Sequence, residues 1–245
     1  MRIAGAVRAA AAVAACGVLL TSCGSSDGAG AGAKNDQGAG RAKRAEASPT
    51  TDLKRIPDVG ERLRSKIPEN SRQVVAVYGE GVDSAKSRVV LYEKSGSTWD
   101  KTRTWSAHNG KKGWTTDHRE NDKRSPVGVF TLTDAGGVLA DPGAGLPYTR
   151  SASMQAPRYW AKSHWHDFDY VIAIDYNRAK GTPPNDPTRP QGQSKGGSIW
   201  LHMDHGSGTS GCVSLSKEGM RYLLKNLEPK QHPVVLMGDK ANLKD

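Results

Sequence analysis

The sequence predicts a mostly β protein of the β-rich α+β class, with one or two short helices. Short runs rich in β-branched and aromatic residues recur along the chain, separated by segments that contain Gly and Pro. Helical periodicity is confined to two short segments. From residue 53 to residue 245 the composition is that of one globular domain of ordinary size, which predicts a single folded domain there.

Residues 1–22 have the layout of an export signal, with a basic start and an apolar run over residues 9–20. That run is too short and too rich in alanine to span a bilayer stably. The segment Leu20–Cys23 resembles a bacterial lipobox, in which the cysteine is lipidated and becomes the new N-terminus. We therefore predict lipidation at Cys23 and an extracytoplasmic protein with a lipid anchor in the bacterial cell membrane. An ordinary secretory signal and an uncleaved anchor are the alternatives.

The segment 23–52 is rich in Gly, Ala and Ser and holds no large apolar residue, so it predicts a flexible tether. The chain carries a formal net charge of +10 at pH 7, which favours anionic partners such as lipid headgroups or cell-wall polymers. The export signal argues against nucleic acid as that partner. Solubility is the alternative explanation for the charge.

Seven runs predict strands, and the first two are joined by a loop that contains Gly, as in a hairpin. The runs cover residues 73–78, 87–92, 99–107, 127–133, 170–176, 198–202 and 234–237.

Two segments predict helices, residues 58–66 and residues 216–227. In the second, Ser216 can cap the N-terminus and apolar residues recur at helical spacing. Pro229 ends it. Residues 177–197 are rich in Gly, Pro, Asn and Arg and predict a long loop, a kind of segment that is often functional.

The chain has three cysteines, and export would remove Cys16 with the signal and place lipid on Cys23. Cys212 then has no partner for a disulfide and is either a passive buried residue or a nucleophile. It follows a Gly-rich turn, and Gly211 could aim backbone N–H groups at a substrate oxygen. His202 ends a predicted strand, and the nine-residue loop 203–211 is long enough to bring its imidazole to the thiol. On residue types alone, an inert cysteine with an unrelated histidine is an equal alternative.

The segment from His202 to Val213 resembles the catalytic motif of the L,D-transpeptidase (YkuD-like) family. In that family a His at a strand end is followed by a loop, then by Ser/Thr-x-Gly-Cys and an apolar residue. A second match lies upstream, where Ser125–Phe130 resembles the family's Ser/Thr-Pro-x-Gly-x-Phe segment. The resemblance covers residues 70–238 and implies an L,D-transpeptidase-like β-sandwich domain.

The resemblance implies a role for each matching residue. Cys212 would be the nucleophile and His202 its general base, while Thr209 occupies the Ser/Thr position of the motif. Gly211 and Cys212 would supply the oxyanion hole. The imidazole would be oriented by the main-chain carbonyl of Met203.

Two positions depart from the family pattern: Ser210 stands where many members have a second His, and Ser214 where Asn or Arg is usual. The loop between the His and the Cys is also shorter than in better-known members. These departures bear on substrate contacts, so we predict Ser210 and Ser214 as substrate-binding positions. Tyr148 and Trp165, on predicted loops, are further candidates.

His202, His205 and Cys212 could together bind zinc, but their spacing fits no common zinc motif. We expect no metal and no cofactor. His164 and His166 are interpreted as cleft or surface residues.

The resemblance implies a peptidoglycan L,D-transpeptidase that acts on tetrapeptide stems and forms 3→3 crosslinks through a cysteine acyl-enzyme. We expect the protein to be a monomer. The resemblance also implies that carbapenems form an adduct at Cys212. The same site could act as an L,D-carboxypeptidase, and a wall-binding lipoprotein without turnover is the alternative outside catalysis. A depressed thiol pKa would favour an enzyme. A papain-like peptidase fits poorly, because its Cys precedes its His in the chain.

Overall fold

The computed structural model describes residues 50–245. The predicted signal, Cys23 and nearly all of the predicted tether lie outside the described residues, so those assignments stay predictions. Within residues 50–245, no helix is both long enough and apolar enough to cross a bilayer.

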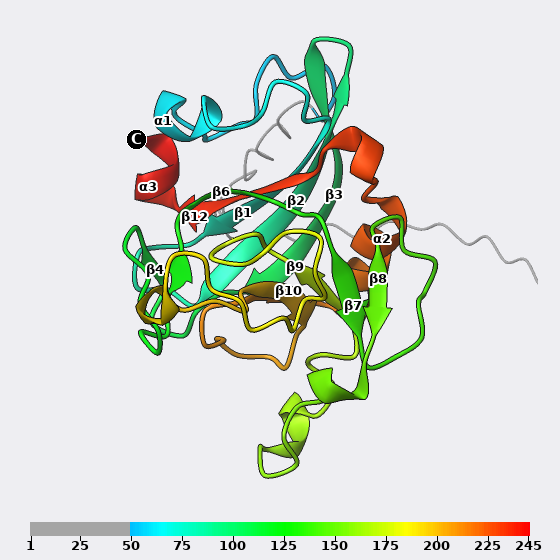
Figure 1. Ribbon diagram of the computed structural model, residues 1–245. Coiled ribbons are helices and arrows are strands. Elements are labelled where there is room, and N and C mark those ends of the chain that lie inside the picture. The colour runs from blue at the N-terminus through cyan, green and yellow to red at the C-terminus, as the bar shows by residue number, and fades with distance from the viewer. Residues whose placement is uncertain (1–49) are drawn as a thin grey trace, which may run out of the picture. The chain divides into compact units, whose positions relative to one another are not determined.

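Twelve strands, three α-helices and four 3₁₀ helices make up the described part of the chain (Figure 1). The strands are β1 (Gln73–Gly79), β2 (Lys86–Ser95), β3 (Thr98–His108), β4 (Trp114–Thr115), β5 (Ser125–Pro126), β6 (Gly128–Thr131), β7 (Ala135–Gly137), β8 (Tyr148–Arg150), β9 (Val171–Ala173), β10 (Trp200–Met203), β11 (Val213–Leu215) and β12 (Val234–Asp239). The helices are α1 (Glu61–Arg64), α2 (Lys217–Asn226), α3 (Lys240–Lys244), η1 (Ala152–Met154), η2 (Lys162–His164), η3 (Gln193–Lys195) and η4 (Pro229–Gln231).

Ten of the strands form one sheet in the order β6-β12-β1-β2-β3-β11-β10-β9-β7-β8, and β4 pairs with β5 in a small second sheet. The predicted hairpin is confirmed, because β1 and β2 pair antiparallel over the whole length of β1. β12 then adds parallel to β1 and β6 adds antiparallel to β12. This order places the C-terminal strand β12 between β1 and the edge strand β6.

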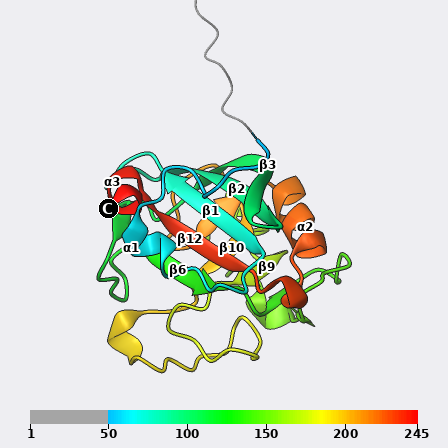
Figure 2. The ribbon, with the colours of Figure 1, turned by 90° about the horizontal axis from the view of Figure 1, so that it is seen from above.

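The sheet folds so that its two halves enclose the main core, which confirms the mostly β, sandwich-like prediction. Figure 2 shows β1 and β12 lying over β9 and β10. Val75 and Leu91 from one half pack with Leu201, Val213 and Leu215 from the other, and all five are fully buried. Burying each such side chain contributes about 1.5–3 kcal/mol, so this core is the main source of stability.

Helix α2 closes one side of the main core, and it begins as predicted: the Ser216 hydroxyl accepts a hydrogen bond from the Gly219 N–H at 3.1 Å. Helix α1 is shorter than predicted, because Asp58 adopts a left-handed φ of 58° that is incompatible with a helix starting there. Helix α3 was not predicted. It packs beside α1 (Figure 1), where the Gly60 N–H donates to the Leu243 carbonyl at 2.7 Å.

The predicted long loop 177–197 is confirmed, since η3 is its sole helical or strand element. Its start is held by Arg178, whose side chain is only 4% exposed and forms ion pairs with Asp134 and Asp175. The same guanidinium donates to the Thr182 carbonyl at 2.6 Å. A buried charge network therefore fixes the loop against β7 and β9.

Candidate active site

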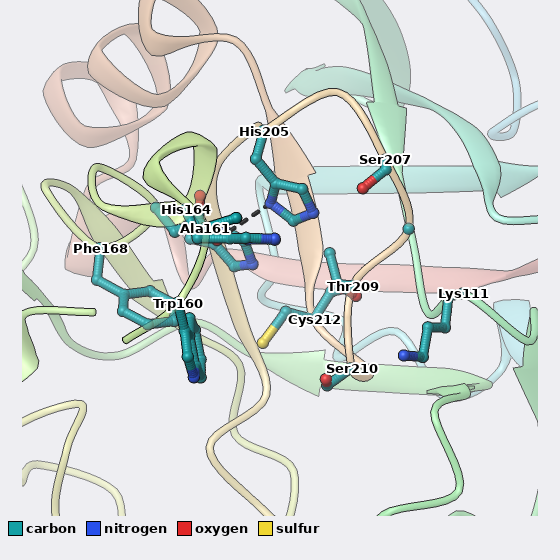
Figure 3. Close-up of a pocket in the computed structure, with 13 residues that line it drawn as sticks. Lys111, Trp160, Ala161, His164, Phe168, His205, Ser207, Thr209, Ser210 and Cys212 are labelled. Atoms are coloured by element: carbon teal, nitrogen blue, oxygen red, sulfur yellow. Dashed lines mark hydrogen bonds and ion pairs between the residues drawn. The ribbon is translucent and has the colours of Figure 1, made fainter. Parts of the chain in front are cut away.

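The pairing of β10 with β11 places the predicted nucleophile and base on one face of the sheet. The two strands are parallel, with Leu201 opposite Val213 and His202 opposite Ser214. Side chains alternate along a strand, so Leu201 and Val213 enter the core while His202 and Cys212 lie on the other face. His202 and Cys212 both line a cavity of about 500 Å³, into which the thiol points in Figure 3.

The Cys212 sulfur is held by the backbone that leads into β10. The Trp200 N–H donates to Sγ at 3.4 Å, and the thiol donates to the Ser198 carbonyl at 3.4 Å. Burial raises the pKa of the Cys212 thiol to about 11, although the Trp200 N–H acts in the opposite direction. The resting group is thus a neutral thiol. The depressed pKa that would mark a preformed thiolate is not found.

The imidazole of His202 is oriented by the main-chain carbonyl of Met203, as the family resemblance implied. His202 Nδ1 lies 2.8 Å from that oxygen. A carbonyl can only accept, so Nδ1 carries the proton and Nε2 is left with a lone pair. His202 is 3% exposed, and burial lowers its pKa below the usual value. A neutral imidazole with a free Nε2 is the form that a general base requires.

The upstream motif reaches the cysteine turn through Ser125. This residue is fully buried, accepts from the Gly110 N–H at 2.8 Å and donates to the Gly211 carbonyl at 2.7 Å. The Ser-Pro segment thereby fixes the residue that precedes Cys212. Two motifs that lie far apart in the sequence form one structural unit.

Thr209 closes the cysteine turn from the other side. Its hydroxyl donates to the Cys212 carbonyl at 2.6 Å and accepts from the Gly211 N–H at 3.1 Å. Gly211 has a φ of +147°, and a Cβ there would lie 3.1 Å from the Arg124 carbonyl oxygen, so glycine is required. The predicted oxyanion donor at Gly211 is therefore engaged by Thr209 in this conformation.

The two departures from the family pattern lie in different surroundings. Ser210 is exposed and lines the cavity. Ser214 is fully buried, and its hydroxyl donates to Asp204 Oδ1 at 2.7 Å. Asp204 also contacts His108 at 2.9 Å, and these two hydrogen bonds overcome the effect of burial and lower the pKa of the carboxyl. Ser214 thus fixes the loop after β10 and does not line the cavity.

The two predicted aromatic candidates also lie away from the cavity lining. The Tyr148 hydroxyl donates to the Leu139 carbonyl at 3.0 Å, and burial raises its pKa. Trp165 Nε1 donates to the Trp160 carbonyl at 3.0 Å. It is Trp160, from the projecting segment between η1 and β9, that lines the cavity (Figure 3).

Several lining residues were missed by sequence reasoning: Lys111, Asp167, Phe168 and Trp160. A second cavity of about 100 Å³ also reaches Cys212 and is lined in part by Gly211, Ser210 and His118. Burial lowers the pKa of His118. No local pattern marks these residues, because they reach the thiol only through the folding of distant loops.

The structure does not group His205 with His202 and Cys212 as a ligand set. It groups His205 with His164 and Asp167, whose ligand atoms all lie within 4.8 Å of one another. His166, the other histidine of that segment, points away, with a side chain that is 74% exposed. Three residues that could hold a metal therefore line the same cavity as the thiol.

The family model of the L,D-transpeptidase catalytic domain, YkuD, matches residues 81–236. That span is more than half of the chain and contains both motifs, from Ser125 to Cys212. The chain belongs to this family. YkuD domains are cysteine-dependent transpeptidases, and the fold described above is the β-rich fold of the family.

One similar solved structure is described as the structure of Bdellovibrio bacteriovorus Bd1075. The two are 18% identical with a TM-score of 0.38, and the match covers 68% of this chain and 48% of that one. This chain thus matches about half the length of that protein. No curated protein matches the chain in sequence.

Proposed function

We propose that the chain is a peptidoglycan L,D-transpeptidase that forms 3→3 crosslinks on tetrapeptide stems through an acyl-enzyme at Cys212. One observation carries the proposal. The Cys212 thiol and the His202 imidazole line one cavity, and the imidazole is held by Met203 in the tautomer that accepts a proton. The match to the cysteine-dependent YkuD family supports the same chemistry.

In the first half-reaction His202 Nε2 takes the thiol proton as Sγ attacks the carbonyl carbon of the L-centre of the third stem residue. A C–S bond forms and the carbonyl oxygen becomes an oxyanion. The C–N bond to D-Ala then breaks, and Nε2 returns the proton to the leaving amine. Burial raises the pKa of the Cys212 thiol, which favours removal of its proton by His202 during the attack.

The oxyanion needs donors that strengthen as its charge develops. The backbone N–H of Cys212 and that of Gly211 are the proposed pair. The Gly211 N–H donates to the Thr209 hydroxyl in the free structure, so it must exchange this neutral acceptor for the oxyanion. An anionic acceptor forms the stronger hydrogen bond, which favours the exchange in the transition state.

In the second half-reaction an amine of another stem attacks the thioester and gives its proton to His202. The new C–N bond forms the crosslink, the C–S bond breaks and the sulfur regains its proton. Two separate cavities reach Cys212, which supports separate positions for acyl donor and acceptor. Water as the acceptor would make the same site an L,D-carboxypeptidase.

Product analysis tests this proposal. The full chain and a Cys212→Ser variant are incubated with a disaccharide tetrapeptide, and products are identified by mass. We expect a dimer that has lost one D-Ala with the wild type and no product with the variant. Tripeptide without dimer would mean hydrolysis. Unchanged substrate with a folded wild-type protein would contradict both and support a wall-binding protein.

Acylation by a carbapenem tests the nucleophile without the natural substrate. The proposal expects an intact-mass increase equal to one carbapenem, located on Cys212 by peptide mapping. The Cys212→Ser protein should keep its original mass. An unmodified wild-type protein after prolonged incubation would count against an active site at this position.

We further propose that the protein acts outside the cytoplasm, anchored to the membrane by lipid on Cys23. The lipobox-like segment Leu20–Cys23 and the net positive charge support this location. In a detergent phase-partition experiment the wild type should enter the detergent phase and Cys23→Ala the aqueous phase. A mature protein that retains Met1 would contradict the proposal.

A further inference from the structure

Beside the thiol, His164, Asp167 and His205 form a cluster that the proposed reaction does not use. His164 Nδ1 lies 3.0 Å from Asp167 Oδ2, and His205 Nδ1 lies 3.0 Å from the same oxygen. The two imidazole rings are 4.1 Å apart between centroids. Two imidazole nitrogens and one carboxylate oxygen thus converge on a small volume, and Figure 3 shows His164 and His205 side by side.

Aligned hydrogen bonds do not explain why the His205 ring is buried. Its side chain is 4% exposed, and within residues 50–245 neither ring nitrogen has an aligned hydrogen-bond partner. Nδ1 is close to Asp167 Oδ2, yet the N–H direction does not meet that oxygen. The Asp167 carboxylate is thus close to the His205 ring without an aligned hydrogen bond, and a buried polar group that lacks one costs about 1–3 kcal/mol. An additional ligand at the His205 ring would therefore be stabilising.

We propose that His164, Asp167 and His205 bind a divalent metal ion of the zinc class. Bonds of about 2.0–2.2 Å to nitrogen and oxygen place neighbouring donor atoms about 3.0–3.5 Å apart. The two contacts to Asp167 Oδ2 are close to that separation. Two ligand atoms of one metal ion direct their lone pairs at the ion and not at each other. A shared ion therefore explains why the His205 ring is close to Asp167 but is not aligned for a hydrogen bond. Imidazole and carboxylate are ligands that zinc accepts.

The backbone around the cluster is already fixed. The Met203 N–H donates to the Asp167 carbonyl at 3.0 Å, and the Asp204 N–H donates to the Leu215 carbonyl at 2.9 Å. These bonds tie the segment of Asp167 to β10 and the loop of His205 to β11, and the two strands are paired with each other. Binding would therefore require only small side-chain shifts, which favours affinity.

The proposed metal site would have a free coordination position. Three protein ligands leave a fourth position, as in zinc sites that bind water or substrate. His164, Asp167 and His205 all line the cavity that contains Cys212, so the open position faces the space where a peptide would lie. An oxygen donor such as water or a peptide carboxylate would complete the site. Metal binding does not depend on turnover at Cys212.

The test measures zinc itself. The full chain, purified without a histidine tag and freed of metal, is titrated with Zn²⁺ by calorimetry. We expect one ion per chain, and dissociation constants at least about 100-fold higher in His164→Ala and in His205→Ala. His166→Ala is the matched control, because this exposed histidine contacts Asp169 instead and should leave binding unchanged. Thermal unfolding of each metal-free variant shows that it is folded.

A further variant separates this site from metal capture by the thiol. Cys212→Ala should keep one zinc per chain, and Co²⁺ bound to the wild type should show no thiolate charge-transfer band. Loss of binding in Cys212→Ala would overturn the proposal, as would binding that persists in both His164→Ala and His205→Ala. So would the lack of stoichiometric binding by the wild type. His164 is about one-third exposed, so its alanine variant should fold even if His205→Ala does not.

Discussion

The two halves of the ten-stranded sheet are stabilised in different ways. In the N-terminal half, β1, β2 and β3 are 7, 10 and 11 residues long, and long ladders of backbone hydrogen bonds join them. In the half that bears the site, β7, β8, β9 and β11 have 3 residues each and β10 has 4. Short ladders fix a chain weakly, so other contacts must position this half.

Buried polar side chains supply those contacts. Those buried in and around the half with the site are Asp134, Asp167, Asp169, Asn177, Arg178, His202 and Ser214. Their partners are mostly backbone groups and charges from other loops, as with Arg178 and Asp134. The comparison indicates that the regular half stabilises the fold, while specific polar contacts hold the irregular half, which contains the candidate site.

The largest expected effect comes from His202, the proposed base on the irregular half. His202→Ala should lower the rate of carbapenem acylation about 10²–10⁴-fold, because proton transfer from the thiol loses its acceptor. The rate is measured by time-resolved intact mass. His166→Ala, an exposed histidine on the same half, is the control and should react at the wild-type rate. Equal rates in His202→Ala and wild type would rule out His202 as the base.

The next effect tests the buried charges directly. Arg178→Met leaves Asp134 and Asp175 without their cation, and the free energy of unfolding should fall by about 3–5 kcal/mol. Urea denaturation measures the change. Arg221→Met, on the exposed face of α2, is the matched control and should stay within about 0.5 kcal/mol of wild type. A loss below about 1 kcal/mol would mean that the network does not support this half.

The same contrast explains which parts could be predicted from the sequence. The hairpin of β1 and β2 and helix α2 were predicted because alternation, helical spacing and the Ser216 cap are local patterns. The pair of Cys212 and His202 was found through a motif within eleven residues. Asp167 and Lys111 had no local signal, because long-range folding of loops brings them to the cavity.

Two predicted site residues have surroundings that the sequence motif did not reveal. Ser214 was predicted to contact substrate, but the parallel register with β10 and its bond to Asp204 keep it inside the sheet. Gly211 was predicted as an oxyanion donor, and its N–H is held by Thr209 in the free structure. Both depend on pairings that a motif does not specify.

The pH dependence of alkylation tests whether the Cys212 thiol, on the irregular half, is neutral at rest. Burial raises the pKa of Cys212 to about 11, so its reaction with iodoacetamide should rise about tenfold per pH unit from pH 7 to pH 9 and continue to rise above it. Rates come from mass spectrometry in folded protein, with urea-unfolded chain as the control that levels off earlier. A plateau near pH 7 would instead indicate a thiolate–imidazolium pair.

The Cys212 thiol and the His202 imidazole make the stability of the folded state depend on pH in opposite directions. The raised thiol pKa stabilises the folded state fully below the usual value of 9.0, and this contribution is lost as pH rises toward about 11. The lowered pKa of His202 stabilises the folded state above the usual value of 6.5, and this contribution is lost as pH falls below it. Maximum stability should therefore lie between these limits.

The smallest expected effect concerns Ser125, where one hydroxyl links the regular sheet region to the cysteine turn. Ser125→Ala leaves the buried Gly110 N–H and Gly211 carbonyl without this partner, which should cost about 1–3 kcal/mol of unfolding free energy. Acylation of Cys212 should also slow, because the turn loses the bond that positions its carbonyl. Ser125→Thr keeps the hydroxyl and should restore the acylation rate even if the extra methyl lowers stability. Slow acylation in both variants would show that packing, and not the hydroxyl, positions the nucleophile.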